Sequence, residues 1–262
     1  MPIAIKTPGE IAAMRSSGRL AWMVVGEVAL ACRPGVTTRE LDHLARAIIA
    51  REGLSPLLLN YQAGDSPPFP GAACVCVNEE IVHAVPSDRI VRAGDAVTID
   101  IAVRDKDGWC ADAATTVVAG GTSSGRGEAI AARARAALAA ALAAAGPGVW
   151  WSRIAKAAAD ALAGTPCMLL GGYCGHGIGR AMHEAPRLCF GRAAGRGVEA
   201  GREDVRLLPG MVVTLEPIVL EKESGPLTLD DGWTVIAAEK CWAAHEERTV
   251  AITRGGCEVL TV

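Results

Sequence analysis

Two aspartates stand out because they fall in a segment that is otherwise typical of a buried β-hairpin. The apolar residues of 97–103 alternate and so face one side of a predicted strand, while Asp100 faces the other. A turn signal at 105–108 predicts a return strand over 109–118, and a hairpin centred on Lys106 places Asp112 opposite Asp100. Facing carboxylates roughly 5 Å apart repel each other. Either water surrounds both acids on an exposed hairpin, or a cation neutralises them.

Two glutamates occur in a similar setting nearer the C-terminal end. Glu216 directly follows the alternating residues 211–215, and Glu247 begins another strand-like run. Glu246 would point to the opposite face of that strand, so that only one of these two neighbours can join a common cluster.

A histidine flanked by glycines completes the set of residues that could perform chemistry. Three glycines surround His176, which lets the backbone approach closely, and His183 follows seven residues later. Two aspartates, two glutamates and one imidazole form an oxygen-rich site that can hold two divalent ions about 3.5–4 Å apart. Such a mixed site suits Mn²⁺, Fe²⁺, Co²⁺ or Zn²⁺ better than Ca²⁺.

The elements that must position these residues recur in two halves of the chain. A helix beginning at Thr7-Pro8 and another capped by Thr37 and Glu40 are predicted before the first strands; helices over about 126–144 and up to about 163 precede the later ones. The segment 34–36 recurs at 147–149, and 94–100 matches 210–216, at offsets of 113 and 116. We therefore predict one α+β catalytic domain over 1–262, with halves of about 1–120 and 121–262 and the site on a pseudo-twofold axis.

Six segments, taken together, resemble type I methionine aminopeptidases. They lie in that family's order along nearly the whole chain, at 77–83, 98–100, 111–112, 174–180, 214–217 and 231–235. The family has the pita-bread fold, in which two pseudo-symmetric halves of helices pack on antiparallel β-sheet. The absence of a long insertion after the His183 region favours type I over type II.

The resemblance implies a two-metal centre. Asp112, His176, Glu216 and Glu247 would hold the first divalent ion. Asp100 would hold the second ion, which Asp112 and Glu247 would share. The backbone near Asn78 could also bind a monovalent cation, as in relatives.

The resemblance also implies how the substrate is handled. Glu216 would move the proton of the attacking water, His183 would stabilise the tetrahedral intermediate, and His83 would contact the peptide nitrogen next to the scissile bond. The residues that match the walls of the methionine pocket are Phe69, Cys74, Met182 and Trp233.

Several positions depart from the family pattern without removing a metal ligand. His245 stands where glutamine is common, Arg248 where histidine is usual, and Met182 where phenylalanine is usual, which would widen the pocket. One extra residue separates Asp100 from Asp112, and 191–204 is long and rich in glycine and arginine, which predicts a mobile loop.

The composition excludes several other classes of protein. The 262 residues carry a net charge of −3 with both signs mixed, which does not favour nucleic acid as the main partner. No apolar run reaches the roughly 18 residues of a membrane span, and the N-terminus does not read as a secretory leader. The nine cysteines include no C-x-x-C pair, so we expect neither a zinc ribbon nor a disulfide framework, but small buried apolar residues in a reducing cytoplasm.

These features predict an enzyme that removes the first methionine from newly made polypeptides, with the ribosome as one setting. It would act as a monomer and prefer a small second residue. A prolidase or proline aminopeptidase is one alternative, although such proteins normally carry a large extra N-terminal domain, and this sequence starts at the first catalytic-domain helix. A non-catalytic binding protein on the same fold is another, although such proteins lose ligands and all five are present here.

Overall fold

The helices begin where the sequence provides capping groups. The computed structural model describes residues 2–121, 125–191 and 204–262. Thr7 and Thr37 each form a capping box, with Glu10 and Glu40, at the start of α1 (Pro8–Ala31) and α2 (Thr38–Arg51). In the later part of the chain α3 (Arg126–Ala144) and α4 (Trp151–Asp160) follow. The predicted helices are confirmed, and α3 has the predicted bounds.

The strands form one large antiparallel sheet and two small ones. The large sheet has nine strands in the order β1-β4-β5-β14-β9-β7-β8, with β2 paired to β4 and β15 paired to β14; the small sheets are β13-β10-β6 and β11-β12-β3. The strand bounds are β1 Ser55–Pro56, β2 Cys74–Val77, β3 Glu80–Val82, β4 Ala96–Arg104, β5 Cys110–Val118, β6 Met168–Leu169, β7 Gly175–Gly177, β8 Glu184–Leu188, β9 Val212–Leu215, β10 Ile218–Leu220, β11 Pro226–Thr228, β12 Val235–Ala237, β13 Ala243–His245, β14 Glu247–Thr253 and β15 Gly256–Val259.

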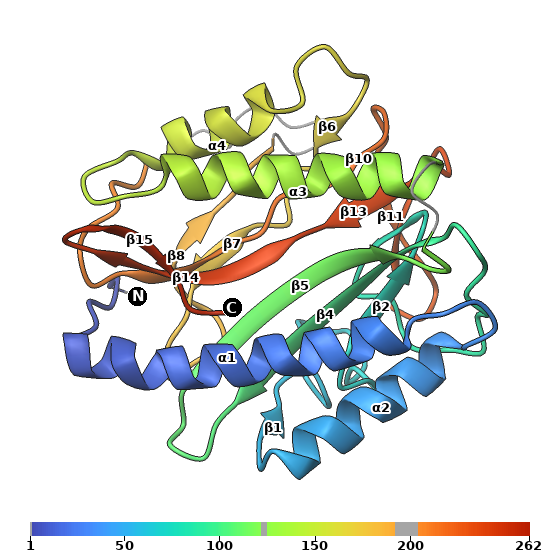
Figure 1. Cartoon of the computed structure of the whole chain (residues 1–262), viewed down its shortest axis with the longest axis horizontal. Coiled ribbons are helices and arrows are strands. Elements are labelled where there is room, and N and C mark those ends of the chain that lie inside the picture. Colours follow the sequence, from blue (N-terminus) through green and yellow to red (C-terminus); the bar gives the residue numbers. More distant parts are fainter. Residues whose placement is uncertain (1, 122–124, 192–203) are drawn as a thin grey trace.

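Both helix pairs pack against the large sheet. In Figure 1, α1 and α2 run along the bottom of the view and α3 and α4 along the top, with the strands between them. One core cluster joins α1 and α2 to the odd-numbered apolar residues of β4, from Val97 to Val103, and another joins α3 and α4 to β9 and β14. Side chains of opposite parity, including Asp100 and Asp112, therefore face away from these helices.

The hairpin of β4 and β5 differs in register from our prediction. Asp100 pairs with Ala114, and Asp112 pairs with Ala102, so the two aspartates are diagonal neighbours rather than directly opposed. The reason lies in the turn, where the Asp105 carboxylate accepts hydrogen bonds from the N–H groups of Asp107 and Trp109 and sets the centre of the hairpin at Asp107. A change of two positions leaves both acids on the same face, so they still meet.

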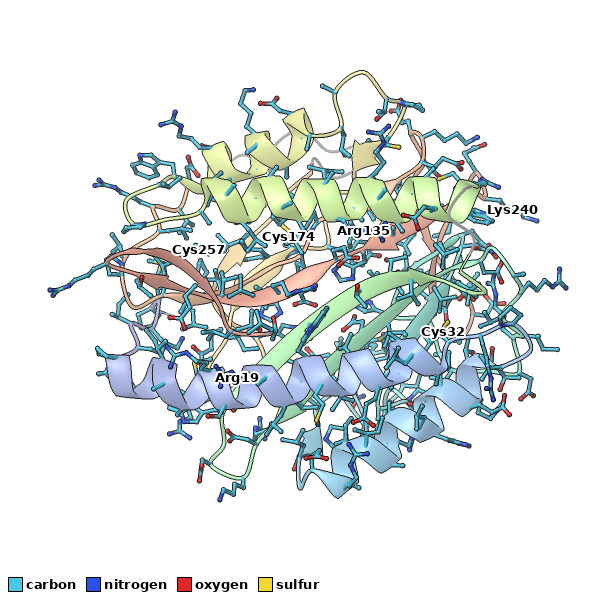
Figure 2. The ribbon with its side chains drawn as sticks, viewed as in Figure 1. Arg19, Cys32, Arg135, Cys174, Lys240 and Cys257 are labelled. Atoms are coloured by element: carbon cyan, nitrogen blue, oxygen red, sulfur yellow. A yellow bond between two sulfur atoms is a disulfide. The ribbon has the colours of Figure 1, made fainter. Side chains whose placement is uncertain are left out.

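The expectation that the cysteines serve as small buried apolar residues does not hold for one pair. Cys174 and Cys189 are joined by a disulfide, and the seven other cysteines are free, five of them buried. The adjacent pairing of Gly175 with Leu188 brings the two cysteines together across β7 and β8, which a count of cysteines cannot reveal. Figure 2 shows the side chains on the same ribbon, with Cys174 labelled.

Three further expectations concern membrane spans, the loop at 191–204 and the division into domains. No helix in the described ranges is both long and apolar enough to cross a membrane. The expected loop at 191–204 lies almost entirely outside the described residues, which omit 192–203. The assignment of one domain with an internal duplication stays a prediction.

Candidate metal centre and substrate cavity

The five predicted metal ligands lie on, or directly follow, five neighbouring strands of the large sheet. Asp100 lies on β4, Asp112 on β5, His176 on β7 and Glu247 at the start of β14, while Glu216 directly follows β9. The middle of the sheet order, β4-β5-β14-β9-β7, places these strands side by side. Residues far apart in the sequence therefore meet where the two halves of the sheet join.

The side chains converge closely enough to share a cation. One ligand atom each of Asp112, His176 and Glu247 lies within 4.8 Å of the others. The His176 Nε2 atom is 3.7 Å from a Glu216 carboxylate oxygen and 3.9 Å from an Asp112 carboxylate oxygen. The structure thus brings together the acids and the imidazole that the sequence singled out.

The protonation of His176 leaves its Nε2 atom facing these acids as an acceptor. The Nδ1 atom lies 3.0 Å from the carbonyl oxygen of Gly177, and a carbonyl can only accept a hydrogen bond. Nδ1 therefore carries the proton and Nε2 presents a lone pair. Burial also lowers the pKa of this histidine, which favours the neutral ring. A lone pair beside carboxylates is the arrangement that a metal ion, rather than a proton, satisfies.

The acids repel one another in a setting that disfavours their charge. Burial and the neighbouring carboxylates raise the pKa of Asp112 and of Glu247 well above their ordinary values. Burial, together with the charge of Glu216, raises the pKa of Asp100 to about 7, and burial raises the pKa of Glu216 to about 7. One carboxylate oxygen of Asp112 and one of Glu247 are buried without a hydrogen-bond partner in the protein. The donor set therefore fits a divalent cation, which would supply the missing partner and charge.

Threonines of the sheet hold several of these groups in place. The Thr249 hydroxyl accepts from the Asp112 N–H and donates to its carbonyl oxygen. The Thr214 hydroxyl accepts from the His176 N–H and lies 2.6 Å from a Glu216 carboxylate oxygen. Such partners fix the orientation of metal ligands from behind.

The expectation that only one of the two neighbouring glutamates joins the cluster is met. Glu246 lies on the opposite side, where its carboxylate accepts hydrogen bonds from the Thr115 hydroxyl and the Thr116 N–H. Arg248 also points away from the cavity, with its guanidinium 3.7 Å from the ring centre of Trp22 on α1. The departure from the family pattern at Arg248 therefore concerns packing against a helix rather than the metal centre.

The acids open on a cavity of about 710 Å³. All eleven residues that the sequence assigned to the site line this cavity: Phe69, Cys74, His83, Asp100, Asp112, His176, Met182, His183, Glu216, Trp233 and Glu247.

One end of the cavity is apolar. The Phe69 ring packs edge-on against Trp233 at 5.4 Å between ring centres, and Cys74 belongs to the same buried cluster. Met182 is also buried and lines the cavity. The indole N–H of Trp233 donates a hydrogen bond to the Pro67 carbonyl, which fixes the ring. The result is a slot that is lined by sulfur atoms and aromatic rings.

Two histidines lie between the apolar end and the acids. The His183 ring is 4.4 Å from that of His176, and the His83 ring packs edge-on against Trp233 at 6.1 Å. Burial, and in each case the charge of a neighbouring histidine, lowers the pKa of both His83 and His183 to about 4. Both rings are therefore neutral near pH 7 and can donate a hydrogen bond without adding a second positive charge.

Tyrosines at the cavity were missed by reasoning from the sequence. The Tyr61 hydroxyl lies 3.2 Å from His183 Nδ1, and the Tyr173 ring packs against His83. Tyr61 lies in the segment 54–70, which resembles the family poorly, so that only the rarity of tyrosine in this chain could have drawn attention to it.

The monovalent cation expected near Asn78 is not tested by the structure. The Asn78 carbonyl accepts from the Ala243 N–H, and its side chain bonds to Asp95 and to the Ala96 N–H. Asn78 has a positive φ of 56°, which turns its backbone sharply. The cation at this position stays a prediction.

Comparison with known proteins identifies the family. The model of metallopeptidase family M24 matches residues 12–254. The chain belongs to metallopeptidase family M24. Within this metallopeptidase family it is similar to methionine aminopeptidase 1 of Bacillus subtilis, at 33% identity over 99% of both chains. It is also 33% identical to the methionine aminopeptidase of Escherichia coli, over 100% of this chain and 95% of the relative.

Solved structures of two methionine aminopeptidases and of a prolidase show the same architecture. A methionine aminopeptidase from Rickettsia prowazekii has a TM-score of 0.89 at 28% identity over 100% of both chains, and one from Thermotoga maritima has 0.88 at 30% over 99% of both. A prolidase from Pyrococcus furiosus, at 21% identity and a TM-score of 0.71, covers 98% of this chain and 65% of its own, and shares the fold. The predicted α+β pita-bread fold and the resemblance to methionine aminopeptidases are confirmed.

Proposed function

We propose that this M24 metallopeptidase removes the N-terminal methionine from polypeptides with the help of two divalent cations. One observation carries the proposal: the buried cluster of Asp112, His176 and Glu247 opens directly on a cavity whose far end is apolar. Full-length relatives that are named methionine aminopeptidases support it. Its substrates would be newly made polypeptides, at the ribosome in the cytoplasm, and it would act as a monomer.

The carboxylates would hold the two ions as the resemblance implies. Asp112, His176, Glu216 and Glu247 would hold one, and Asp100 would hold the other with Asp112 and Glu247 shared. When bound, the ions would polarise the scissile carbonyl and lower the pKa of water. Cobalt, manganese, iron and zinc all suit this donor set.

The remaining polar residues would move and place protons. Glu216, whose pKa of about 7 lies near neutrality, would accept a proton from the attacking water and pass it to the leaving amine. His183 would donate a hydrogen bond from Nε2 to the carbonyl oxygen as negative charge develops on it, because the Tyr61 hydroxyl can donate to Nδ1 and leave the proton of the neutral ring on Nε2. His83 would contact the nitrogen next to the scissile bond.

The apolar end would select the methionine side chain. A flexible thioether fits a slot formed by two aromatic rings, a thiol and another thioether, at Phe69, Trp233, Cys74 and Met182. The second residue would lie near His83 and His183, where two histidine rings leave room for a small side chain. The enzyme would therefore prefer glycine, alanine or serine after methionine.

The deciding experiment is a peptide assay on chelator-treated protein after addition of each divalent metal. Met-Gly-Ser, Met-Ala-Ser and Met-Ser-Ser should be cleaved, Met-Lys-Ser and Met-Phe-Ser should be spared, and Ala-Pro should not be hydrolysed. Cleavage of X-Pro peptides in preference to Met-Ala-Ser would identify a prolidase or proline aminopeptidase instead. No hydrolysis with any metal would favour the non-catalytic alternative, and equal rates across the methionyl set would contradict the preference for a small second residue.

A further inference from the structure

His245 is a buried histidine on the cavity wall that none of the roles above uses. Only 3% of the residue is exposed, and it lines the same cavity as the acids and the two other histidines. Both of its ring nitrogens are buried without a hydrogen-bond partner in the protein. A water molecule or a bound ligand in the cavity can supply the partners that the protein does not.

The backbone of His245 is held on both sides, so its Cα–Cβ bond has a defined direction. Its N–H donates to the Thr116 hydroxyl, which in turn donates to the His245 carbonyl oxygen. On the other side the residue pairs with Ile218 of β10. Glu247, two residues later, also faces the cavity, whereas Glu246 between them faces Thr115 and Thr116.

The unsatisfied nitrogens require an explanation because such groups are unfavourable in a folded core. A buried donor or acceptor that stays unpaired loses the hydrogen bonds it makes with water in the unfolded chain, which destabilises the folded protein. A neutral imidazole offers one N–H donor and one lone pair, and a peptide group offers the complementary carbonyl acceptor and N–H donor.

The metal centre does not provide these partners. In the described part of the chain, the groups close enough to share an ion are Asp112, His176 and Glu247, and His245 is not among them. The methionine side chain does not provide them either, because it is apolar and belongs at the Phe69 and Trp233 end. His83 lines the same cavity and would contact the nitrogen next to the scissile bond, so it marks the side where the substrate continues past that bond.

We infer that His245 binds the second peptide group of the substrate, the one that follows the scissile bond. This inference rests on the proposed function and adds a main-chain contact to it. The imidazole would donate to or accept from the main chain of the second residue, next to the contact made by His83. Such a contact recognises a continuing polypeptide and not merely a methionyl group.

The test compares two substrates that differ in the second peptide group. Met-Ala-Ser contains it, whereas methionine p-nitroanilide has the same α-amine and methionyl carbonyl but lacks it. In His245→Leu we expect kcat/KM for Met-Ala-Ser to fall by 10- to 100-fold, chiefly through KM, and by at least tenfold more than for the anilide. His245→Gln, which restores a donor and an acceptor, should recover Met-Ala-Ser to within about threefold of the original enzyme.

Several outcomes would overturn the inference. These are an equal loss on both substrates, a loss of bound metal measured by mass spectrometry, or a glutamine variant no better than leucine. If His245→Leu does not fold, the unaltered enzyme provides the test: a Met-Ala-Ser analogue with an ester in place of the second peptide bond should be cleaved at least fivefold more slowly, and an equal rate would contradict the contact. Should the unaltered enzyme cleave neither Met-Ala-Ser nor the anilide, the proposed function fails instead.

Discussion

The two ends of the cavity are built in different ways. At the acidic end, Asp100, Asp112, His176 and Glu247 lie on paired strands of the large sheet, with threonines behind them. At the apolar end, Phe69 and Trp233 lie outside the strands and hold their places by packing against each other and by the hydrogen bond of the Trp233 indole.

This difference reflects two requirements: metal binding needs precise positions, whereas the choice of the substrate side chain needs only a suitable pocket. Groups that share a cation must meet within a few ångströms, and a hydrogen-bonded sheet fixes them with that accuracy. An apolar slot needs only the right volume and shape, which several side chains can supply. Changes at the acidic end should therefore abolish turnover, whereas changes at the apolar end should adjust preference.

The largest effect is expected at the shared carboxylates. Asp112→Asn or Glu247→Gln removes a charge that would serve two ions, and we expect turnover of Met-Ala-Ser to fall at least roughly a hundredfold. The measurement is kcat together with the metal content of the purified variant. Asp88→Asn, at an acid whose side chain is 86% exposed, is the matched control and should retain full rate. A variant that kept more than a few per cent of turnover with both metals bound would contradict the two-metal assignment.

The acids should also make the stability of the metal-free protein depend on pH. The pKa values of Asp100 and Glu216 rise on folding to about 7, so below about pH 4 these acids are protonated in both states and impose no penalty. As the pH rises to about 7, the unfolded chain releases protons that the folded chain retains, and stability is lost.

Calorimetry from pH 4.5 to 7.5 should therefore show Tm of the metal-free protein falling by several degrees more than that of metal-free Asp100→Asn. Saturating divalent cation should remove most of the extra fall with pH in the unaltered protein, because the bound ion neutralises the acids. Parallel Tm curves without metal would show that the cluster is not strained by its charges.

A smaller effect is expected where the two ends meet. Tyr61→Phe keeps the ring packing against His183 and Trp233 but removes the hydroxyl that lies 3.2 Å from His183 Nδ1. Because one hydrogen bond is worth about 1 kcal/mol, we expect kcat to fall about fivefold with little change in KM or in metal content. An unchanged kcat would mean that His183 does not depend on Tyr61 for its orientation.

The smallest effect is expected at Met182, which replaces a common phenylalanine. A flexible thioether adapts to several side chains, whereas a flat ring does not. Met182→Phe should raise the ratio of kcat/KM for Met-Ala-Ser over Leu-Ala-Ser by about tenfold, since one methylene of misfit is worth about 1–3 kcal/mol. If the ratio stays the same, Met182 does not shape the methionine pocket.

The features that could be predicted from the sequence are those that depend on local patterns. The capping boxes at Thr7 and Thr37, the alternation around Asp100 and the glycines around His176 are local patterns, and the structure bears out the elements that they predict. The acids could be placed on one face because alternation along a strand survives an error of two residues in register. That error occurred at the Lys106 turn, where the side-chain hydrogen bonds of Asp105 select the centre of the hairpin.

The features that the sequence did not reveal depend on long-range proximity. The disulfide between Cys174 and Cys189 follows from the pairing of β7 with β8, and the place of Tyr61 beside His183 follows from the path of a loop. His245 was visible only as a departure from the family, since the sequence does not show that both ring nitrogens lack partners. Patterns of spacing describe neighbours along one element, and none of these contacts lies within one element.

Because of strand β14, the five ligands come together only when both parts of the chain have folded. This strand pairs with β5, which follows α1 and α2, and with β9, which follows α3 and α4, and it carries Glu247 at the junction. Neither half of the sequence contains all five ligands, so a chain released early or docked out of register lacks a complete chelate. Metal affinity should then mark complete synthesis and assembly, and a cell that supplies metal sparingly would load finished molecules in preference to fragments.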